Sequence, residues 1–198
     1  PVVVPLRHNN CLFIFLYLLF QLFDLTLKGR VLEIGVGSGL NLPLYSDKVE
    51  RVFGVDPSAE LLRIAANAAG GAQPDVELIE GLAETVPLED ASVDCVVVTW
   101  SLCSVTDPQK VVGEVRRVLK PTGRLLFVEH GLAPEHSVRR WQDRLTPIWR
   151  RCAGNCHLNR PVALLIEDCG FRMERLDTGY AKGPKPITFM YEGVARPN

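Results

Sequence analysis

Short apolar runs and amphipathic stretches alternate along the chain between positions 30 and 130. The run at 93–99 is rich in β-branched residues, which is typical of a strand buried on both faces of a sheet. The stretch after Asp107 carries its valines at helical spacing instead. Strands that alternate with helices predict an α/β domain whose parallel sheet is covered on both sides. The predicted strands are 31–34, 49–55, 76–79, 93–99 and 125–128, and the predicted helices are 58–69, capped by Ser58, and 107–120, stopped by residues 121–123.

The pattern changes after residue 130. Residues 131–160 contain six arginines but only two acids, and an apolar stripe at spacings of three and four predicts a helix that Pro147 kinks or divides. We expect this insertion to cover the substrate side of the domain as a helical lid. Contact with an anionic membrane surface and plain packing of the stripe on the sheet are the alternatives. The stripe consists of Val138, Trp141, Leu145, Ile148, Trp149 and Cys152.

The end of the chain returns to strands. A helix is predicted over 161–168, and the segments 171–176 and 187–194 have the composition of two last strands. The loop 182–186 between them contains a glycine and two prolines. Such a tight return favours an antiparallel pair.

The first 29 residues do not continue this pattern. Residues 11–20 form an unbroken apolar run of ten, whereas a membrane-spanning helix needs about 20 apolar residues. We expect this run to form a buried helix that packs on the domain, with an interfacial anchor as the alternative. The chain is therefore divided into an atypical apolar segment, 1–29, and one α/β domain, 30–198, which contains the insertion.

The chain has 198 residues and a balanced charge, with 22 Lys and Arg against 23 Asp and Glu. This balance gives no reason to expect a nucleic-acid partner. Six cysteines occur without a CxxC pair, and although Cys152, Cys156 and His157 are close in sequence, we expect ordinary thiols and no metal site. Free thiols fit a cytoplasmic location, with peripheral membrane association as the alternative. The sequence does not define an oligomeric state.

The most specific motif is the glycine loop at 33–39, which reads EIGVGSG. It follows a predicted strand, and open α/β sheets bind ligands at the carboxyl ends of their strands. A dinucleotide-binding loop has the spacing GxGxxG, but Leu40 stands where its third glycine belongs. Glu33 would repel a pyrophosphate and would suit a ligand with an ammonium group. The loop therefore disfavours a nicotinamide-dependent oxidoreductase, which we keep as an alternative.

Two more loops extend this candidate site. Asp56 closes the second predicted strand, 21 residues after Gly35, where a carboxylate can accept hydrogen bonds from both ribose hydroxyls. Capping of the following helix is its alternative role. The loop 80–84, after the third predicted strand, offers backbone amides to an adenine edge.

Five motifs occur in the order VLEIGVGSG, GVDPS, EGLAE, VPLEDASVDCVVV and EVRRVLKPTGRLLFVEH. Over residues 30–130 they resemble the class I S-adenosylmethionine-dependent methyltransferases. The segments WSLCSV, FVEHG, RRWQDRLTPIWRRCAGNCHLNR and IEDCGF are similar to the alkyl-thiol methyltransferases of animals and to bacterial quinone-type and phospholipid-type relatives, and they extend the likeness to position 172. The resemblance implies a Rossmann-like, doubly wound, mostly parallel seven-stranded sheet with an antiparallel last strand. It also implies S-adenosylmethionine as the cofactor and S-adenosylhomocysteine as the product.

The resemblance also assigns the cofactor contacts. In this family the acid and glycines of the first loop hold the methionine part, the acid after the second strand holds the ribose, and the loop after the third strand holds the adenine. Many relatives carry Asp in that last loop, where this chain has Leu82. The expected cofactor-binding residues are Glu33, Gly35, Gly37, Gly39, Asp56, Leu82, Ala83 and Trp100.

Methyl transfer from a sulfonium is an in-line displacement, so the protein mainly aligns the acceptor and excludes water. A thiol, amine or hydroxyl acceptor must also lose a proton. Candidate residues lie past the fourth and fifth strands, where we expect His130 to act as a base or to orient the substrate. Glu129 and Cys103 are further catalytic candidates, with a structural acid facing backbone amides and a small buried thiol as their alternatives. His157 would reach the site from the insertion.

The Asn-Pro-Pro-aromatic signature of N-methyltransferases is absent after the fourth predicted strand, where the chain reads WSLC. The expected function is methyl transfer to a small lipophilic acceptor, which is a thiol by resemblance or else a quinone or lipid headgroup. Because residues 1–29 do not resemble the family, a non-catalytic cofactor-binding protein is the main alternative.

Overall fold

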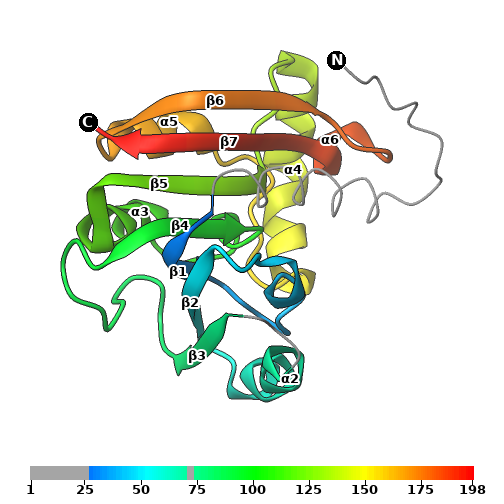
Figure 1. Ribbon diagram of the computed structural model, residues 1–198. Coiled ribbons are helices and arrows are strands. Elements are labelled where there is room, and N and C mark those ends of the chain that lie inside the picture. Colours follow the sequence, from blue (N-terminus) through cyan, green and yellow to red (C-terminus); the bar gives the residue numbers. More distant parts are fainter. Residues whose placement is uncertain (1–26, 71–73) are drawn as a thin grey trace, which may run out of the picture.

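The computed structural model describes residues 27–70 and 74–198. These residues form a seven-stranded sheet in the order β3-β2-β1-β4-β5-β7-β6 (Figure 1). The first five strands pair in parallel, whereas β7 is antiparallel to both β5 and β6. The predicted Rossmann-like topology with an antiparallel last strand is confirmed. The strands are β1 (Gly29–Ile34), β2 (Val49–Asp56), β3 (Asp75–Glu80), β4 (Val93–Thr99), β5 (Leu119–His130), β6 (Phe171–Tyr180) and β7 (Phe189–Pro197).

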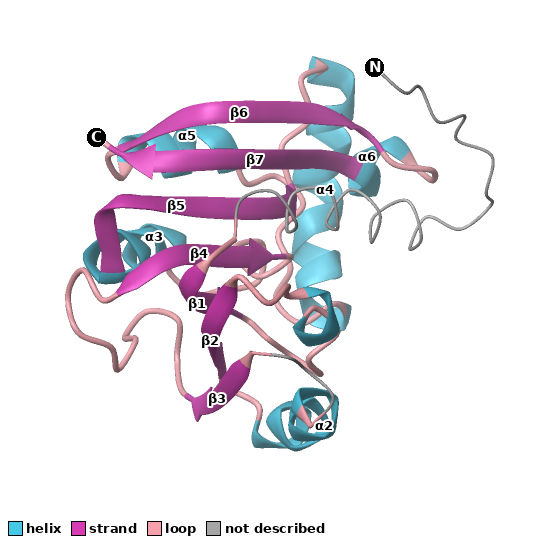
Figure 2. Cartoon of the chain, in the orientation of Figure 1, coloured by secondary structure: helices cyan, strands magenta, loops and turns pink. Residues whose placement is uncertain are grey.

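The two predicted crossover helices begin where the sequence places them, and the predicted cap at Ser58 is confirmed. Ser58 precedes α2 (Ala59–Ala69) and accepts a hydrogen bond from the backbone N–H of Leu61. Asp107 precedes α3 (Pro108–Val118) and accepts one from Lys110. Figure 2 shows these two helices and the remaining ones around the sheet. The others are η1 (Leu42–Leu44), α4 (His136–Cys152), α5 (Val162–Asp168) and α6 (Lys185–Thr188).

Of two expectations about prolines, the helix stop at residues 121–123 is wrong, and the kink or division at Pro147 is wrong as to the division, whereas a kink stays a prediction. Helix α3 ends at Val118, and residues 121–123 lie inside β5, which is longer than predicted because it begins at Leu119. Pro147 does not divide α4, which is continuous through it. Pro147 is exposed, so the carbonyl that loses its helical N–H partner there can bond to water instead.

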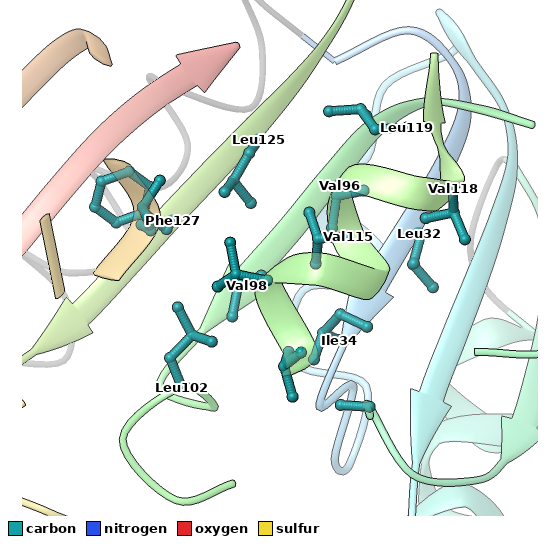
Figure 3. Close-up of a cluster of buried hydrophobic side chains, with 14 of the residues drawn as sticks. Leu32, Ile34, Val96, Val98, Leu102, Val115, Val118, Leu119, Leu125 and Phe127 are labelled. Atoms are coloured by element: carbon teal, nitrogen blue, oxygen red, sulfur yellow. The ribbon is translucent and has the colours of Figure 1, made fainter. Parts of the chain in front are cut away.

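The sheet is buried on both faces. On one face, α3 and α5 pack on β1, β4 and β5, and Figure 3 shows Val115 and Val118 of α3 beside Val96 of β4. On the other face, α2 and η1 pack on β1 and β2 through Leu62 and Leu42. Strand β4 contributes to both clusters, which confirms the prediction made from its β-branched run.

Helix α4 stands at the edge of the sheet where the parallel strands end, and the arrowhead of β4 points toward it in Figure 1. Its buried side is partly polar. Gln142 is 1% exposed and bonds to the backbone of Ala133 and Gly131. The apolar stripe, in contrast, leaves Trp141 and Ile148 at 55% and 67% exposure. Packing of the whole stripe on the sheet is therefore wrong.

In the part of the chain that the structure describes, no helix is both long and apolar enough to cross a bilayer. The predictions for residues 1–26, including the apolar run 11–20, lie outside the described residues.

Candidate functional site

A cleft of about 480 Å³ opens at the carboxyl ends of the parallel strands. This is where open α/β sheets bind ligands, and the volume lies in the range of small-molecule sites. Five of the eight predicted cofactor residues line it. They are Gly35, Asp56, Leu82, Ala83 and Trp100, and the predicted Glu33, Gly37 and Gly39 are not part of its wall.

The glycine loop is shaped by the protein's own packing. Gly35 has a φ of +69°, and a Cβ there would lie 2.0 Å from the Oγ of Ser101. That hydroxyl donates a hydrogen bond of 3.0 Å to the carbonyl of Ile34. The missing side chain therefore lets the loop after β4 approach the end of β1. Both segments then face the cleft.

Asp56 connects the glycine loop to the start of α2. Its Oδ2 accepts from the backbone N–H of Gly37 at 3.0 Å, and its Oδ1 accepts from that of Ser58 at 2.8 Å. It is 7% exposed and lines the cleft. Because each carboxylate oxygen has two lone pairs, both retain the capacity to accept a ligand hydroxyl.

Glu33 is buried behind the wall of the cleft. Its two oxygens accept hydrogen bonds of 2.7 Å from the side-chain amide of Asn41 and the hydroxyl of Tyr45. Burial raises the pKa of Glu33 to about 7, and the two hydrogen bonds oppose that shift. The sequence reasoning did not identify Asn41 and Tyr45 as partners. A direct contact of Glu33 with a ligand stays a prediction.

The loop after β4 is held from one side by Glu129. This carboxylate is fully buried and accepts from the backbone N–H groups of Ser101, Leu102 and Cys103, at 2.6, 2.8 and 3.3 Å. Burial raises its pKa to about 7, while the N–H groups oppose the shift. Glu129 does not line the cleft. Its contacts match the alternative of a structural acid that faces backbone amides.

The segment after α4 holds the same loop through its carbonyl groups. Asn155 donates to Ser104, the backbone N–H of His157 donates to Cys103, and Arg160 donates to Val105, at 2.8, 2.8 and 2.7 Å. A second nitrogen of Arg160 reaches the carbonyl of Leu102. Residues 101–105 are therefore fixed on both sides. Sequence spacing contained no signal for Asn155 or Arg160.

Two of the three predicted catalytic residues, Cys103 and His130, lie beside Cys156, which was not among the catalytic candidates. The side-chain ligand atoms of Cys103, His130 and Cys156 all lie within 4.8 Å of one another. The Nε2 of His130 is 2.9 Å from the Sγ of Cys156. The thiol of Cys103 lowers the pKa of Cys156 by hydrogen bonding, burial opposes the shift, and His130 lowers it further. The same hydrogen bond raises the pKa of Cys103.

The group suspected from the sequence is not assembled. Cys152 is exposed on α4, and the Nδ1 of His157 lies 3.2 Å from the carbonyl of Cys103 and 3.0 Å from Arg160. Burial lowers the pKa of His157, and the charge of Arg160 adds to the shift. His157 therefore serves the loop, whereas Cys156 joins Cys103 and His130.

Comparisons with known proteins agree with this geometry. A family model described as a methyltransferase domain matches residues 32–127. Human thiol S-methyltransferase TMT1B is 34% identical over 170 residues, which cover 84% of this chain and 68% of that protein. Phosphatidylethanolamine N-methyltransferase of Cereibacter sphaeroides is 40% identical over 104 residues, which cover 52% of this chain and 51% of that protein. The chain spans about half to two thirds of the length of these relatives.

Solved structures support the fold. The crystal structure of a SAM-dependent methyltransferase from Methanosarcina mazei superposes with a TM-score of 0.70 and 24% sequence identity. The match covers 90% of this chain and 96% of that one. At this identity the likeness shows the fold alone.

Proposed function

Because the chain belongs to the S-adenosylmethionine-dependent methyltransferases, we propose that it transfers a methyl group from S-adenosylmethionine to a small, lipophilic thiol. The observation that carries the proposal is the cleft, whose wall combines Ile34 and Gly35 of the glycine loop, Asp56 and the loop after β3 with the fixed loop after β4. The similarity to proteins named thiol S-methyltransferases favours a thiol among the possible acceptors.

The residues of the cleft fit the parts of the cofactor. Asp56 would accept hydrogen bonds from the ribose hydroxyls through its remaining lone pairs. Leu82 and Ala83 would form the apolar slot for the adenine, and Gly35 would leave room beside the methionine part. When bound, S-adenosylmethionine supplies an already activated methyl group. The protein therefore mainly has to bind and orient the acceptor and to exclude water from it.

The acceptor side begins at the loop after β4. Trp100, Ser104 and Val105 line the cleft there, together with Gly154 of the segment after α4. Hydrogen bonds on both sides fix this loop, which favours accurate positioning of an acceptor. A thiol acceptor must lose its proton, and half-buried His130 is the proposed base or orienting group.

Binding and transfer are tested separately. We expect calorimetry to detect binding of S-adenosylhomocysteine but not of NAD. Asp56→Asn should weaken S-adenosylhomocysteine binding about tenfold or more, because a neutral amide replaces the charged carboxylate that accepts the hydrogen bonds. The matched control is Asp75→Asn, which alters an exposed carboxylate that pairs with Arg51. Binding of NAD alone would support the oxidoreductase alternative and contradict the proposal.

Transfer is measured with labelled S-adenosylmethionine and a panel of aliphatic thiols, reduced quinones, phenols and phosphatidylethanolamine. We expect the thiols to be methylated fastest. Preferential methylation of a quinol or a lipid would contradict the thiol assignment but not the methyltransferase. Cofactor binding with no transfer to any member of the panel would favour the non-catalytic alternative.

We also propose that α4 contacts an anionic membrane surface. Trp141 and Ile148 are exposed, and the guanidinium of Arg144 lies 5.8 Å from the centre of the Trp141 ring. Arg140 and Arg151 are exposed on the same helix, and a helix with exposed aromatic and aliphatic residues beside arginines suits a lipid interface. Such contact would bring the cleft to lipophilic acceptors.

Vesicle flotation tests this contact. The protein should float with vesicles that contain phosphatidylserine, and the double change Trp141→Ala, Ile148→Ser should reduce that fraction. Leu164→Ser is the control, because Leu164 is 59% exposed on α5, away from α4. Equal flotation of the double variant, or no binding at low salt, would contradict the proposal.

A further inference from the structure

Cys103, His130 and Cys156 form a compact set of soft ligands that the proposed function leaves unexplained. They come from three separate segments: the loop after β4, the end of β5 and the loop after α4. Both thiols are buried, at 2% and 9% exposure, and the imidazole is half-buried. In the part of the chain that the structure describes, this is the one cluster of His, Cys, Asp or Glu side chains close enough to hold a metal ion.

The chemistry of this set matches zinc. Two thiolates and one imidazole form a known three-residue donor set for this ion, and three protein ligands leave the fourth tetrahedral position for an exchangeable ligand. Donor atoms that share a tetrahedral ion lie roughly 3.5–4 Å apart, and the three atoms here lie within 4.8 Å of one another. The donor atoms are therefore already close to the spacing that one tetrahedral ion requires.

The backbone that carries the ligands is already fixed. Cys103 donates its N–H to Glu129, and its carbonyl accepts from the N–H of His157. The N–H of Cys156 donates to the carbonyl of Ala153 at 3.0 Å. Ligands held in place by surrounding hydrogen bonds are typical of metal sites.

The cluster also adjoins the cleft. Ser104, next to Cys103, and Gly154, two residues before Cys156, both line the cleft wall. We propose that Cys103, His130 and Cys156 bind one zinc-type divalent cation, and that its fourth position takes the acceptor as a thiolate. The second half of this proposal rests on the proposed function, whereas the first half does not.

The assignment changes the role of His130 from base to ligand. On coordination the S–H bond of the acceptor breaks and its proton passes to solvent. A sulphur lone pair of the acceptor then forms the new C–S bond while the methyl–sulfonium bond of the donor breaks. The products are a thioether, S-adenosylhomocysteine and the released proton, so no oxidant or reductant is required.

Cobalt(II) tests the cation site directly, because thiolate ligands produce intense charge-transfer absorption. The reduced, chelator-treated chain should bind about one Co²⁺, with X-ray absorption showing two sulphurs at about 2.3 Å and one nitrogen at about 2.0 Å. Cys103→Ser, Cys156→Ser and His130→Ala should each weaken or abolish the absorption. Cys152→Ser, an exposed thiol outside the cluster, should not change it.

Circular dichroism and urea unfolding show which variants are folded, so the test of the cation site does not depend on cofactor binding. Absence of charge-transfer absorption in the wild-type chain would overturn the cation site. Absorption that persists in both Cys156→Ser and His130→Ala would do the same, because the cobalt would then lie on other thiols.

The acceptor position is tested without turnover. An aliphatic thiol added to the cobalt-loaded chain should increase the charge-transfer absorption, and the matching alcohol should not. An unchanged spectrum would overturn the acceptor role and leave a structural cation. Cobalt binding without S-adenosylhomocysteine binding would retain the cation site while the proposed function fails, so the two failures are distinguishable.

Discussion

Glu33 and Glu129 are both buried carboxylates at the carboxyl ends of parallel strands, and burial raises the pKa of each to about 7. Their partners differ. Glu33 accepts hydrogen bonds from two side chains, Asn41 and Tyr45, which follow it within 12 residues. Glu129 accepts from three backbone N–H groups more than 25 residues earlier in the chain.

This difference separates the two sides of the cleft. On the cofactor side, most supports of the glycine loop lie near it in sequence, because Asn41, Tyr45 and Asp56 all follow it within 25 residues. On the acceptor side, the loop 101–105 has its shape only because distant segments hold its N–H groups and its carbonyls. Substitutions on the cofactor side should act through local backbone strain and through the pKa of Glu33. Substitutions on the acceptor side should act by releasing the backbone of the loop 101–105.

The largest expected effect is that of Gly35→Ala. The new Cβ would lie 2.0 Å from the Oγ of Ser101, and the left-handed φ adds about 1–2 kcal/mol of strain. Because the loop must move, we expect affinity for S-adenosylhomocysteine to fall more than about tenfold and stability to fall by about 3 kcal/mol. Calorimetry and urea unfolding measure the two effects.

Two glycine variants serve as controls for that change. Gly154→Ala meets no atom within 4 Å but has a φ of +57°, so it reports the backbone strain without the clash. Gly113→Ala lies inside α3 with open space around it and should stabilise the chain by up to about 1 kcal/mol. If Gly35→Ala and Gly154→Ala behave alike, the close approach of Ser101 is not what requires Gly35.

Glu129→Gln should have the next largest effect. The amide NH₂ that replaces one carboxylate oxygen must face a backbone N–H donor, and an unsatisfied buried donor costs about 1–3 kcal/mol. We expect stability to fall by that amount at neutral pH, and methyl transfer to fall more than cofactor affinity. Glu174→Gln, which alters a partly exposed ion pair, is the control. Equal losses of transfer and affinity would contradict a role confined to the acceptor side.

Much of the cofactor side is predictable from sequence, because its determinants are local. The glycine spacing, the end of β2 at Asp56 and the cap at Ser58 are all visible in one short stretch. The acceptor side is predictable only in part. Cys103 and His130 follow strands, but Cys156 joins them through tertiary contacts that no spacing encodes.

For a related reason, the sequence pattern does not identify which side chains of α4 are buried. A stripe of apolar side chains normally marks the buried face of a helix. Here Gln142 is buried instead, because the backbone of Gly131, Ala133 and Pro186 satisfies its side-chain amide. Hydrogen-bonding partners provided by the tertiary fold outweigh the pattern in the sequence.

Glu33→Gln should change the pH dependence of stability more than stability itself. A carboxyl whose pKa rises from 4.5 to about 7 on folding holds its proton more tightly in the folded state. Its contribution is therefore present at low pH and is lost as the pH rises through about 7. Between about pH 5 and about pH 7, the wild-type chain should lose about 2 kcal/mol relative to Glu33→Gln. Urea unfolding at several pH values measures the difference, and parallel curves would contradict the raised pKa.

The smallest expected effect sharpens the cofactor side. Leu82 is 58% exposed in the wall of the cleft, at the position where the family resemblance implies Asp. Leu82→Asp would offer a carboxylate as hydrogen-bond acceptor to the exocyclic amine of adenine. Such a hydrogen bond contributes roughly 0.5–1.5 kcal/mol, so affinity for S-adenosylhomocysteine should rise several-fold. S-inosylhomocysteine, which lacks that amine, should show no gain, and Leu164→Asp on α5 should leave both affinities unchanged. A gain for both ligands would mean that the carboxylate acts through the general field of the cleft, because a specific hydrogen bond requires the amine as donor.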